Sequence, residues 1–331
     1  MARRALATRC RRACRASACS RADAGAGSTV GTTVRFPQRD QPMPAAPDLV
    51  IAVASSALFD LTDGDAVFRE AGAEAYRRHQ REHELTPPPP GVAMPFVRRL
   101  LEAGGDAVEV VLLSRNDPDT GLRVRHAIDH HGLPIRRLAF TGGREPYPYL
   151  EAFEASLFLS ANRDDVEAAI ARGWAAGVVT PSSAIDDDGT ELRIAFDFDG
   201  VLADDGSERL FKEQGLAAYH RIEAANHDQA LTPGPLHRFL LSLAKVQRTT
   251  TRIRTAIITA RSAPADRRVI TSLRAWGVTV DESFFVGDLP KDRIIKLFRP
   301  HLFFDDKRAN ADLGATAAPS VHVPFGVLNG R

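Results

Sequence analysis

An internal repeat constrains the fold of this chain more than any other feature of its sequence. The stretch at residues 51–59 reads IAVASSALF, and the stretch at 194–202 reads IAFDFDGVL, an offset of 143 residues. At the same offset, EAGAEAY at 70–76 faces EQGLAAY at 213–219. Self-similarity at a fixed period is the mark of a repeated structural unit. The first strand-like run of each half therefore predicts the same local structure twice.

The repeat continues along the chain with an offset of 145 residues. VVLLSRN at 110–116 faces TAIITAR at 255–261, and LFLSA at 157–161 faces LFFDD at 302–306. One match would carry little weight, but the matches keep their order and drift by only two residues. The pattern predicts an internal duplication.

Each copy alternates short apolar runs with helical patterns, such as those at 265–276 and 291–298. This alternation is typical of βαβ units and a largely parallel sheet. We predict an α/β fold of tandem, duplicated, Rossmann-like domains with parallel sheets flanked by helices. The predicted domains span 47–183 and 184–331, joined by a turn-rich, acidic linker at 181–191.

The second copy holds about fifty residues between its first two strands, at 203–254, far more than a βα loop needs. Two helical stretches, at 207–225 and 236–247, are separated by the turn LTPGP. Because ligands bind beyond the carboxyl ends of the strands in such sheets, an insertion there would cover a site. We predict a small helical cap in the second copy.

The charge is divided unevenly along the chain. The 331 residues carry a formal net charge of +1, yet residues 1–47 contain nine Arg and two Asp, so that the rest of the chain has a charge of −6. The body therefore lacks the positive field of a nucleic-acid-binding protein. No run reaches the roughly 18 apolar residues of a membrane span. We expect neither nucleic acid nor membrane as a partner.

Residues 1–46 are predicted to be a disordered basic tail or a mis-assigned start, with Met43 as the alternative first residue. An organelle-targeting segment is the other interpretation of this Arg-, Ala- and Ser-rich stretch. All three cysteines, Cys10, Cys14 and Cys19, lie in it. The body therefore has no disulfide and no cysteine-based zinc site. This favours a reducing compartment, and we expect a cytoplasmic protein.

The strongest chemical signal is the pair of carboxylates in IAFDFDGVL. An apolar run delivers Asp197 and Asp199 at its end, and Gly200 then allows a sharp turn. Side chains alternate along a strand, so residues two apart point the same way. Two neighbouring carboxylates repel, which favours a bound cation or a shared proton. A turn with a helix cap is the alternative interpretation of this pair.

Further polar residues follow later strands of the same copy. Thr259 ends one strand at a strand-to-helix junction, where free backbone amides suit an anion. Lys291 opens a helix, although a cation in a first turn opposes the helix dipole. The apolar run HLFFDD ends in Asp305 and Asp306. These positions favour a functional site over a turn.

This ordered set of Asp pair, Thr, Lys and Asp pair is similar to the motifs of the haloacid dehalogenase superfamily of phosphotransferases. The longer stretches resemble the cytosolic 5'-nucleotidase type I family over about residues 49–328, on the segments ALFDLT, LTPG, FTGG, IRTAIITARSAP, RAWGVTVDESFF, PKDRIIKLFRPHLFFDD and HVPFG. The resemblance implies a haloacid-dehalogenase-like catalytic domain in the second copy and a degenerate, non-catalytic one in the first.

The resemblance also implies roles for single residues. Asp197 would be the nucleophile that forms an aspartyl-phosphate, and Asp199 would be the general acid and then the general base. Mg²⁺ would be the cofactor, held by Asp197, Asp305 and the main-chain carbonyl of Asp199. The phosphate would be bound by Thr259, the amide of Ala260 and Lys291, with Asp306 supporting the metal or the lysine.

The first copy lacks these groups. Asp197 and Asp199 are replaced by Ala54 and Ser56, and Asp305-Asp306 by Ser160-Ala161. One interpretation is a structural duplicate that supports the catalytic domain. The other is a metal-free pocket for a nucleotide effector or part of the substrate. Its candidate residues are Ser56, Ser114, Arg115, Asn116, Thr141 and Gly142.

We therefore predict a Mg²⁺-dependent hydrolase of nucleoside 5'-monophosphates, with a nucleoside monophosphate as substrate. A phosphatase of the same superfamily that acts on another small phosphate ester is one alternative. A nucleotide-sensing module without turnover is another, which Asp199 argues against. A nucleotide effector and a homo-oligomer stay open.

Overall fold

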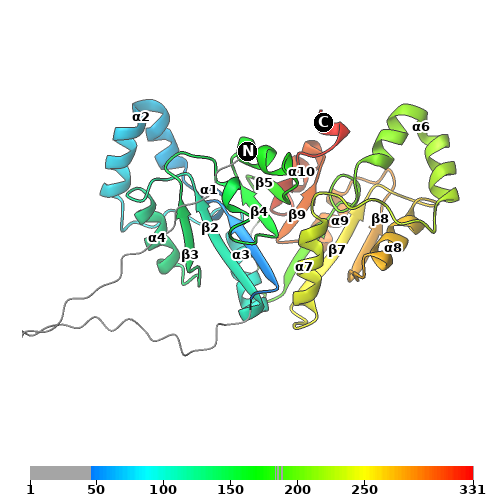
Figure 1. The fold of residues 1–331 in the computed structure, drawn as a ribbon, viewed down its shortest axis with the longest axis horizontal. Coiled ribbons are helices and arrows are strands. Elements are labelled where there is room, and N and C mark those ends of the chain that lie inside the picture. The colour runs from blue at the N-terminus through cyan, green and yellow to red at the C-terminus, as the bar shows by residue number, and fades with distance from the viewer. Residues whose placement is uncertain (1–45, 183, 185, 188, 331) are drawn as a thin grey trace, which may run out of the picture. The chain divides into compact units, whose positions relative to one another are not determined.

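The computed structural model describes residues 46–182, 184, 186–187 and 189–330. The predicted basic tail, apart from Ala46, lies outside the described residues. The stretch Ala45–Arg331 forms one compact unit. It is a mixed α/β structure in which helices flank a single ten-stranded sheet (Figure 1). The predicted α/β class and largely parallel sheet are confirmed.

The first half of this unit carries five strands and five α-helices. Its strands are β1 (Leu49–Val53), β2 (Val108–Ser114), β3 (Arg137–Phe140), β4 (Leu157–Ser160) and β5 (Ala176–Thr180). Its helices are α1 (Ser55–Leu58), α2 (Thr62–Glu82), α3 (Met94–Gly104), α4 (Gly121–His130) and α5 (Arg163–Ile170). Two short 3-10 helices are η1 (Gly105–Ala107) and η2 (Tyr147–Tyr149).

The second half has a similar order of elements, with two α-helices rather than three between its first two strands and an α-helix rather than a 3-10 helix between its third and fourth. Its strands are β6 (Leu192–Phe196), β7 (Ile253–Thr259), β8 (Glu282–Phe285), β9 (Leu302–Asp305) and β10 (Ser320–His322). Its helices are α6 (Gly206–Ala225), α7 (His237–Gln247), α8 (Asp266–Ala275), α9 (Asp292–Phe298) and α10 (Arg308–Gly314). The 3-10 helix η3 (Val327–Asn329) closes the described chain.

The strand order across the sheet is β3-β2-β1-β4-β5-β10-β9-β6-β7-β8. From the outer edge of the sheet toward its centre, the strands of the first half follow the order β3-β2-β1-β4-β5, and those of the second half follow the order β8-β7-β6-β9-β10. The two orders are the same when the strands of each half are numbered along the chain. Within each half all strand pairs are parallel, and the halves join through one antiparallel pair, in which Val179 of β5 lies opposite Val321 of β10. The matching orders support the predicted duplication. The duplication and the domain division near residue 183 stay predictions, and the described halves share one sheet.

Two amphipathic helices, α3 and α7, pack on the sheet and each contacts a strand of the other half. The helix α3 contacts both β2 and β6, and α7 contacts β1 of the other half. On α7 the residues Phe239, Leu240 and Leu243, at positions i, i+1 and i+4 of one helix face, are fully buried. Although α7 falls within the predicted cap region 203–254, it packs on the sheet as part of the core. In that region, α6 is the helix that stands away from the sheet.

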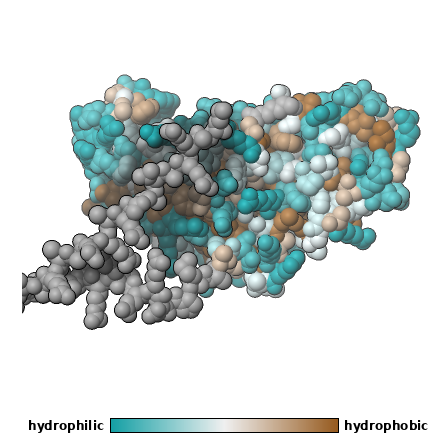
Figure 2. Space-filling model, viewed as in Figure 1, coloured by the Kyte–Doolittle hydropathy of each residue, from teal (hydrophilic) through white to brown (hydrophobic). Residues whose placement is uncertain are grey.

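The helices α2 and α6 follow the first strand of each half and share an unusual bend. Gly72 in α2 has φ 79° and ψ −174°, and Gly215 in α6 has φ 77° and ψ 175°. The insertion predicted for the second copy thus has a counterpart in the first, and Figure 1 shows the two helices at the top of the view, near opposite edges of the sheet. Figure 2 shows hydrophobic surface where α6 lies, and α6 exposes Phe211 and Leu216.

Candidate active site

The two predicted carboxylates stand at the carboxyl end of β6. The backbone N–H of Asp197 donates to the carbonyl of Phe304 on β9 at 2.7 Å, which fixes this residue between neighbouring strands. Phe198 is fully buried on the opposite side, so Asp197 and Asp199 point the same way. Gly200 follows with φ 72°, and a Cβ there would lie 2.5 Å from Asp306 Oδ2. Glycine is therefore required where the loop passes Asp306.

Lys291 lies between two buried carboxylates. Its Nζ is 2.7 Å from Asp197 Oδ2 and 2.7 Å from Asp305 Oδ2. Burial lowers the pKa of Lys291, but Asp197 and Asp305 outweigh this effect and raise the pKa, so the side chain is charged. Asn310 Nδ2 donates to both oxygens of Asp305 at 3.2 Å. These contacts explain why a lysine is placed at the start of α9, where the helix dipole opposes it.

Asp306 completes a cluster of three buried carboxylates with Asp197 and Asp305. One oxygen from each lies within 4.8 Å of the others, which would suit a metal ion. Burial raises the pKa of Asp197 despite Lys291, and burial together with the charges of Asp197 and Asp305 raises the pKa of Asp306. Oδ1 of Asp306 is buried without a hydrogen-bond partner. Three carboxylates and one ammonium leave negative charge to be balanced, so the residues present fit a cation.

A small cavity opens above this cluster. Thr259, the last residue of β7, and Ala260 line it with Asp197, Asp199 and Asp306. Lys291 and Asp305 do not line this cavity, but Lys291 contacts both Asp197 and Asp305. The predicted site residues of the second half therefore lie together. The roles predicted for them stay predictions.

Sequence reasoning missed four residues at this site. Glu208 of α6 and Lys307, which follows β9, also line the cavity, with Lys307 Nζ 3.5 Å from Glu208 Oε2. Arg261 holds both oxygens of Asp199, and Glu223 of α6 holds Arg261. Only the position of Arg261, two residues after Thr259 in the motif ITARS, could have drawn attention to it.

Four of the residues predicted for the effector pocket of the first half are joined by hydrogen bonds. Ser114 accepts from the N–H of Asn116 at 3.1 Å, and the N–H of Gly142 donates to the carbonyl of Asn116 at 3.0 Å. Thr141 Oγ1 donates to the carbonyl of Ser114 at 3.2 Å. These predicted residues lie together, and Ser114 and Asn116 also bond to Ser55 and Tyr76 outside the group.

Arg115 lies between Ser114 and Asn116 in the chain, and its Nη1 donates to the carbonyl of Gly143 at 3.3 Å. The guanidinium of Arg115 forms an ion pair with the buried Asp165, which balances its charge. Ser56 lines a separate cavity of about 550 Å³, together with Asp60 and Asp65. That lining contains no Arg or Lys among the described residues, which disfavours an anion there. The effector pocket stays a prediction.

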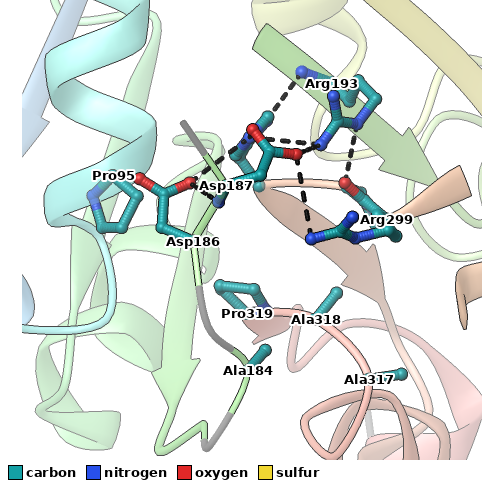
Figure 3. Close-up of a pocket in the computed structure, with 11 residues that line it drawn as sticks. Pro95, Ala184, Asp186, Asp187, Arg193, Arg299, Ala317, Ala318 and Pro319 are labelled. Atoms are coloured by element: carbon teal, nitrogen blue, oxygen red, sulfur yellow. Dashed lines mark hydrogen bonds and ion pairs between the residues drawn. The ribbon is translucent and has the colours of Figure 1, made fainter. Parts of the chain in front are cut away.

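A second acidic cluster lies on the segment between the halves. Asp186, Asp187 and His301 bring ligand-type atoms together. Figure 3 shows that arginines surround these groups, and Arg193 Nη2 lies 2.5 Å from Asp187 Oδ2. Arg99 Nη2 lies 2.8 Å from Asp186 Oδ1. Because cations already balance its charge, we assign no metal to this cluster.

The fold and this site define an α/β protein with a buried, lysine-containing acidic centre that could hold a metal ion at the carboxyl ends of parallel strands. The model of the 5'-nucleotidase family matches residues 41–330. The chain belongs to the 5'-nucleotidase family. The predicted resemblance to the cytosolic type I branch is confirmed by human cytosolic 5'-nucleotidase 1B, which is 34% identical over 317 residues.

That alignment covers 87% of this chain and 52% of the human protein, so the chain spans about half the length of this relative. A solved structure, histidinol dehydrogenase from Elizabethkingia anophelis, is 13% identical, with 83% of this chain and 52% of that chain covered. Its TM-score of 0.23 supports no argument about fold or function. Within the described residues, no helix combines the length and apolar character needed to cross a bilayer.

Proposed function

We propose that this chain hydrolyses nucleoside 5'-monophosphates to nucleoside and phosphate, with Mg²⁺ as cofactor and Asp197 as nucleophile. The observation that carries the proposal is the contact of Lys291 with Asp197 and Asp305, beneath a cavity lined by Asp199 and Thr259. Family membership and the name of the human relative support the substrate class.

The chain's own residues account for both halves of the reaction. An oxygen of Asp197 attacks phosphorus, and the bond to the ribose oxygen breaks as Asp199 gives that oxygen a proton. Asp199 then takes a proton from water as the water attacks the aspartyl-phosphate. Inorganic phosphate leaves, and Asp197 is restored.

Charge stabilisation comes from groups fixed before the substrate arrives. The ammonium of Lys291 stabilises phosphoryl charge, and Thr259 with the amide of Ala260 binds phosphoryl oxygens. Mg²⁺ would be held by Asp197, Asp305 and the main-chain carbonyl of Asp199, with Asp306 beside them. When bound, it would supply positive charge against the phosphate.

Phosphate release from AMP, IMP, GMP, CMP, UMP and their deoxy forms, with and without Mg²⁺, tests this function. Asp197→Asn is expected to lower the release at least about 10³-fold, because the nucleophile is lost. The control is Asp312→Asn, the same chemical change at an exposed carboxylate on α10, and it should leave the rate unchanged.

The outcomes separate the proposal from its alternatives. Release from sugar phosphates but from no nucleotide would indicate a phosphatase for another small ester. Nucleotide binding without release would indicate a sensing module. Full activity of Asp197→Asn would show the mechanism to be wrong.

A further inference from the structure

The carboxylate of Asp199 is hydrogen-bonded through both of its oxygens to a buried arginine, Arg261. Nε of Arg261 donates to Asp199 Oδ2 at 2.7 Å, and Nη2 donates to Oδ1 at 2.7 Å. Two parallel bonds to both oxygens fix the plane of the carboxylate as well as its position. Asp199 also faces the cavity beside Asp197 and Thr259. Its orientation toward that cavity is therefore set by Arg261.

Arg261 has no freedom to turn. Its remaining N–H groups donate to Glu223 Oε2 at 2.6 Å, Ser207 Oγ at 2.6 Å and the carbonyl of Ala265 at 3.3 Å. All five donors of the guanidinium are thus used. The arginine is 3% exposed, and Phe198 packs near its face, 5.7 Å from ring centre to Cζ.

Glu223 joins this arrangement to α6. It is fully buried, it accepts from Ser207 Oγ at 3.0 Å, and it pairs with Arg268 Nη1 at 3.0 Å. Ser207 and Glu223 lie at opposite ends of the bent helix α6. Both ends of the helix therefore meet at Arg261, and through it at Asp199.

The first half of the chain provides an internal comparison. By the offsets of the repeat, Asn116 stands where Arg261 does, and Gln80 stands where Glu223 does. Arg123 Nη1 lies 3.5 Å from Gln80 Oε1, in a contact like that of Arg268 with Glu223, and Tyr76 donates to Asn116 at 3.1 Å. The counterparts of Arg261 and Glu223 are thus neutral, while an arginine stands at the position of Arg268 in both halves.

The charged pair therefore occurs where a carboxylate must be held, since Asp199 has only Ser56 as its counterpart in the first half. A buried arginine–glutamate pair is also a weak source of stability, because desolvating its charges costs much of what their attraction gains. Its presence in one half alone is thus better explained by function than by folding.

We propose that Arg261, itself oriented by Glu223, is the positioning residue that holds Asp199 toward the leaving oxygen. This inference rests on the proposed function, in which Asp199 protonates that oxygen. Arg261 touches no reacting atom in this scheme. It acts by keeping the carboxyl group of Asp199 in the geometry from which its proton can be transferred to the leaving oxygen.

The test compares two substrates that differ in one atom. One is a nucleoside 5'-monophosphate, and the other is its analogue with sulfur in place of the bridging 5'-oxygen. A thiolate leaves without a proton, so the analogue does not need the acid. The full chain is assayed with Mg²⁺, and kcat/KM is measured for each substrate.

The main variant is the double substitution Arg261→Asn with Glu223→Gln, because these neutral residues stand at the corresponding positions of the first half. Its kcat/KM on the oxygen substrate is expected to fall about 10²-fold, within the usual contribution of general acid catalysis. The rate on the sulfur substrate should change less than about 3-fold on the same grounds. Arg261→Lys keeps the positive charge but cannot form two parallel hydrogen bonds to Asp199. It should give an intermediate loss of kcat/KM on the oxygen substrate. The control Arg268→Gln removes a partner of Glu223 but no contact with Asp199, and should leave the ratio of the two rates unchanged.

An equal loss on both substrates, or no loss on either, would overturn the positioning role. Asp199→Asn serves as the reference. If it lowers only the oxygen rate while the Arg261 variants do not, the positioning role alone is wrong. If Asp199→Asn lowers both rates equally, Asp199 is not the general acid, and the positioning role of Arg261 is then wrong as well. If the unmodified chain released phosphate from neither substrate, the proposed function would be wrong.

Discussion

At the scale of single residues, Lys291 is the counter-charge on which the buried carboxylates depend. Replacing it by Met leaves Asp197 and Asp305 without their shared cation, and breaking such a buried pair typically costs about 3–5 kcal/mol. We therefore expect Lys291→Met to lower the free energy of unfolding by about this amount in metal-free buffer, measured by urea denaturation.

Lys296→Met is the matched control for this prediction. It makes the same change on the same helix, α9, at an exposed residue that pairs only with Asp292 four positions away. Exposed pairs of this kind contribute at most about 0.5 kcal/mol. Equal effects of the two substitutions would contradict the role of Lys291 as a buried counter-charge.

The sequence identified the site residues that follow strands and missed those that act through distant partners. Asp197, Thr259 and Asp305 could be found because each ends an apolar run, and parallel strands end at one edge. Glu223 lies within a polar helix, and nothing local shows that it is buried against Arg261. An ion pair between residues 38 positions apart leaves no local pattern in a single sequence.

At the scale of elements, the bend in α6 positions the residues that this helix carries to the site. Gly215 and Gly72 share a backbone conformation that is essentially restricted to glycine, and a Cβ at either would meet no atom within 4 Å. Alanine at either position is therefore expected to cost a similar amount, about 1–3 kcal/mol, from the backbone alone.

Activity should distinguish these two alanine variants. Gly215→Ala changes the helix that brings Glu208 to the cavity and Glu223 to Arg261, so we expect kcat/KM to fall together with stability. Gly72→Ala makes the same change in α2 and should lower stability while leaving kcat/KM unchanged. The measurements are thermal unfolding and phosphate release, and an equal loss of activity in both variants would contradict the prediction.

The element pattern of each half was predictable, but the role of the inserted segment was not. The two helical stretches predicted in the inserted segment, at 207–225 and 236–247, correspond to α6 and α7. Phe239 and Leu243 give α7 the apolar stripe of a core helix, yet periodicity does not say which face of which sheet a helix covers. The counterpart α2 was not predicted as an inserted helix, although the repeat already matched 70–76 with 213–219.

At the scale of the whole described unit, the two halves are tied together by the sheet and by the segment that connects them. The joining strand β10 has three residues, too few for a reliable pattern, so the single ten-stranded sheet could not be foreseen. Arg99 from the first half and Arg193 from the second meet at Asp186 and Asp187 of the connecting segment. His301 belongs to this charged cluster, with its Nε2 3.6 Å from Asp186 Oδ1.

His301 makes the stability of this junction dependent on pH. Burial, with the charges of Arg99 and Arg193, lowers its pKa to about 4, and its Nδ1 accepts from the backbone N–H of Arg193 at 2.9 Å. A histidine in the unfolded chain has a pKa of about 6.5. As the pH falls, the unfolded chain therefore binds the proton first, and stability is lost between about pH 6.5 and 4.

The expected loss from this residue between pH 7 and pH 5 is up to about 2 kcal/mol in the free energy of unfolding. His301→Asn keeps an acceptor near the Nδ1 position but does not titrate, so it should remove this part of the pH dependence. Urea unfolding of both proteins at pH 7, 6 and 5 measures the difference in slope. The same slope in both proteins would mean that His301 is not kept neutral by its surroundings, and that Arg99 and Arg193 do not act on it as the structure indicates.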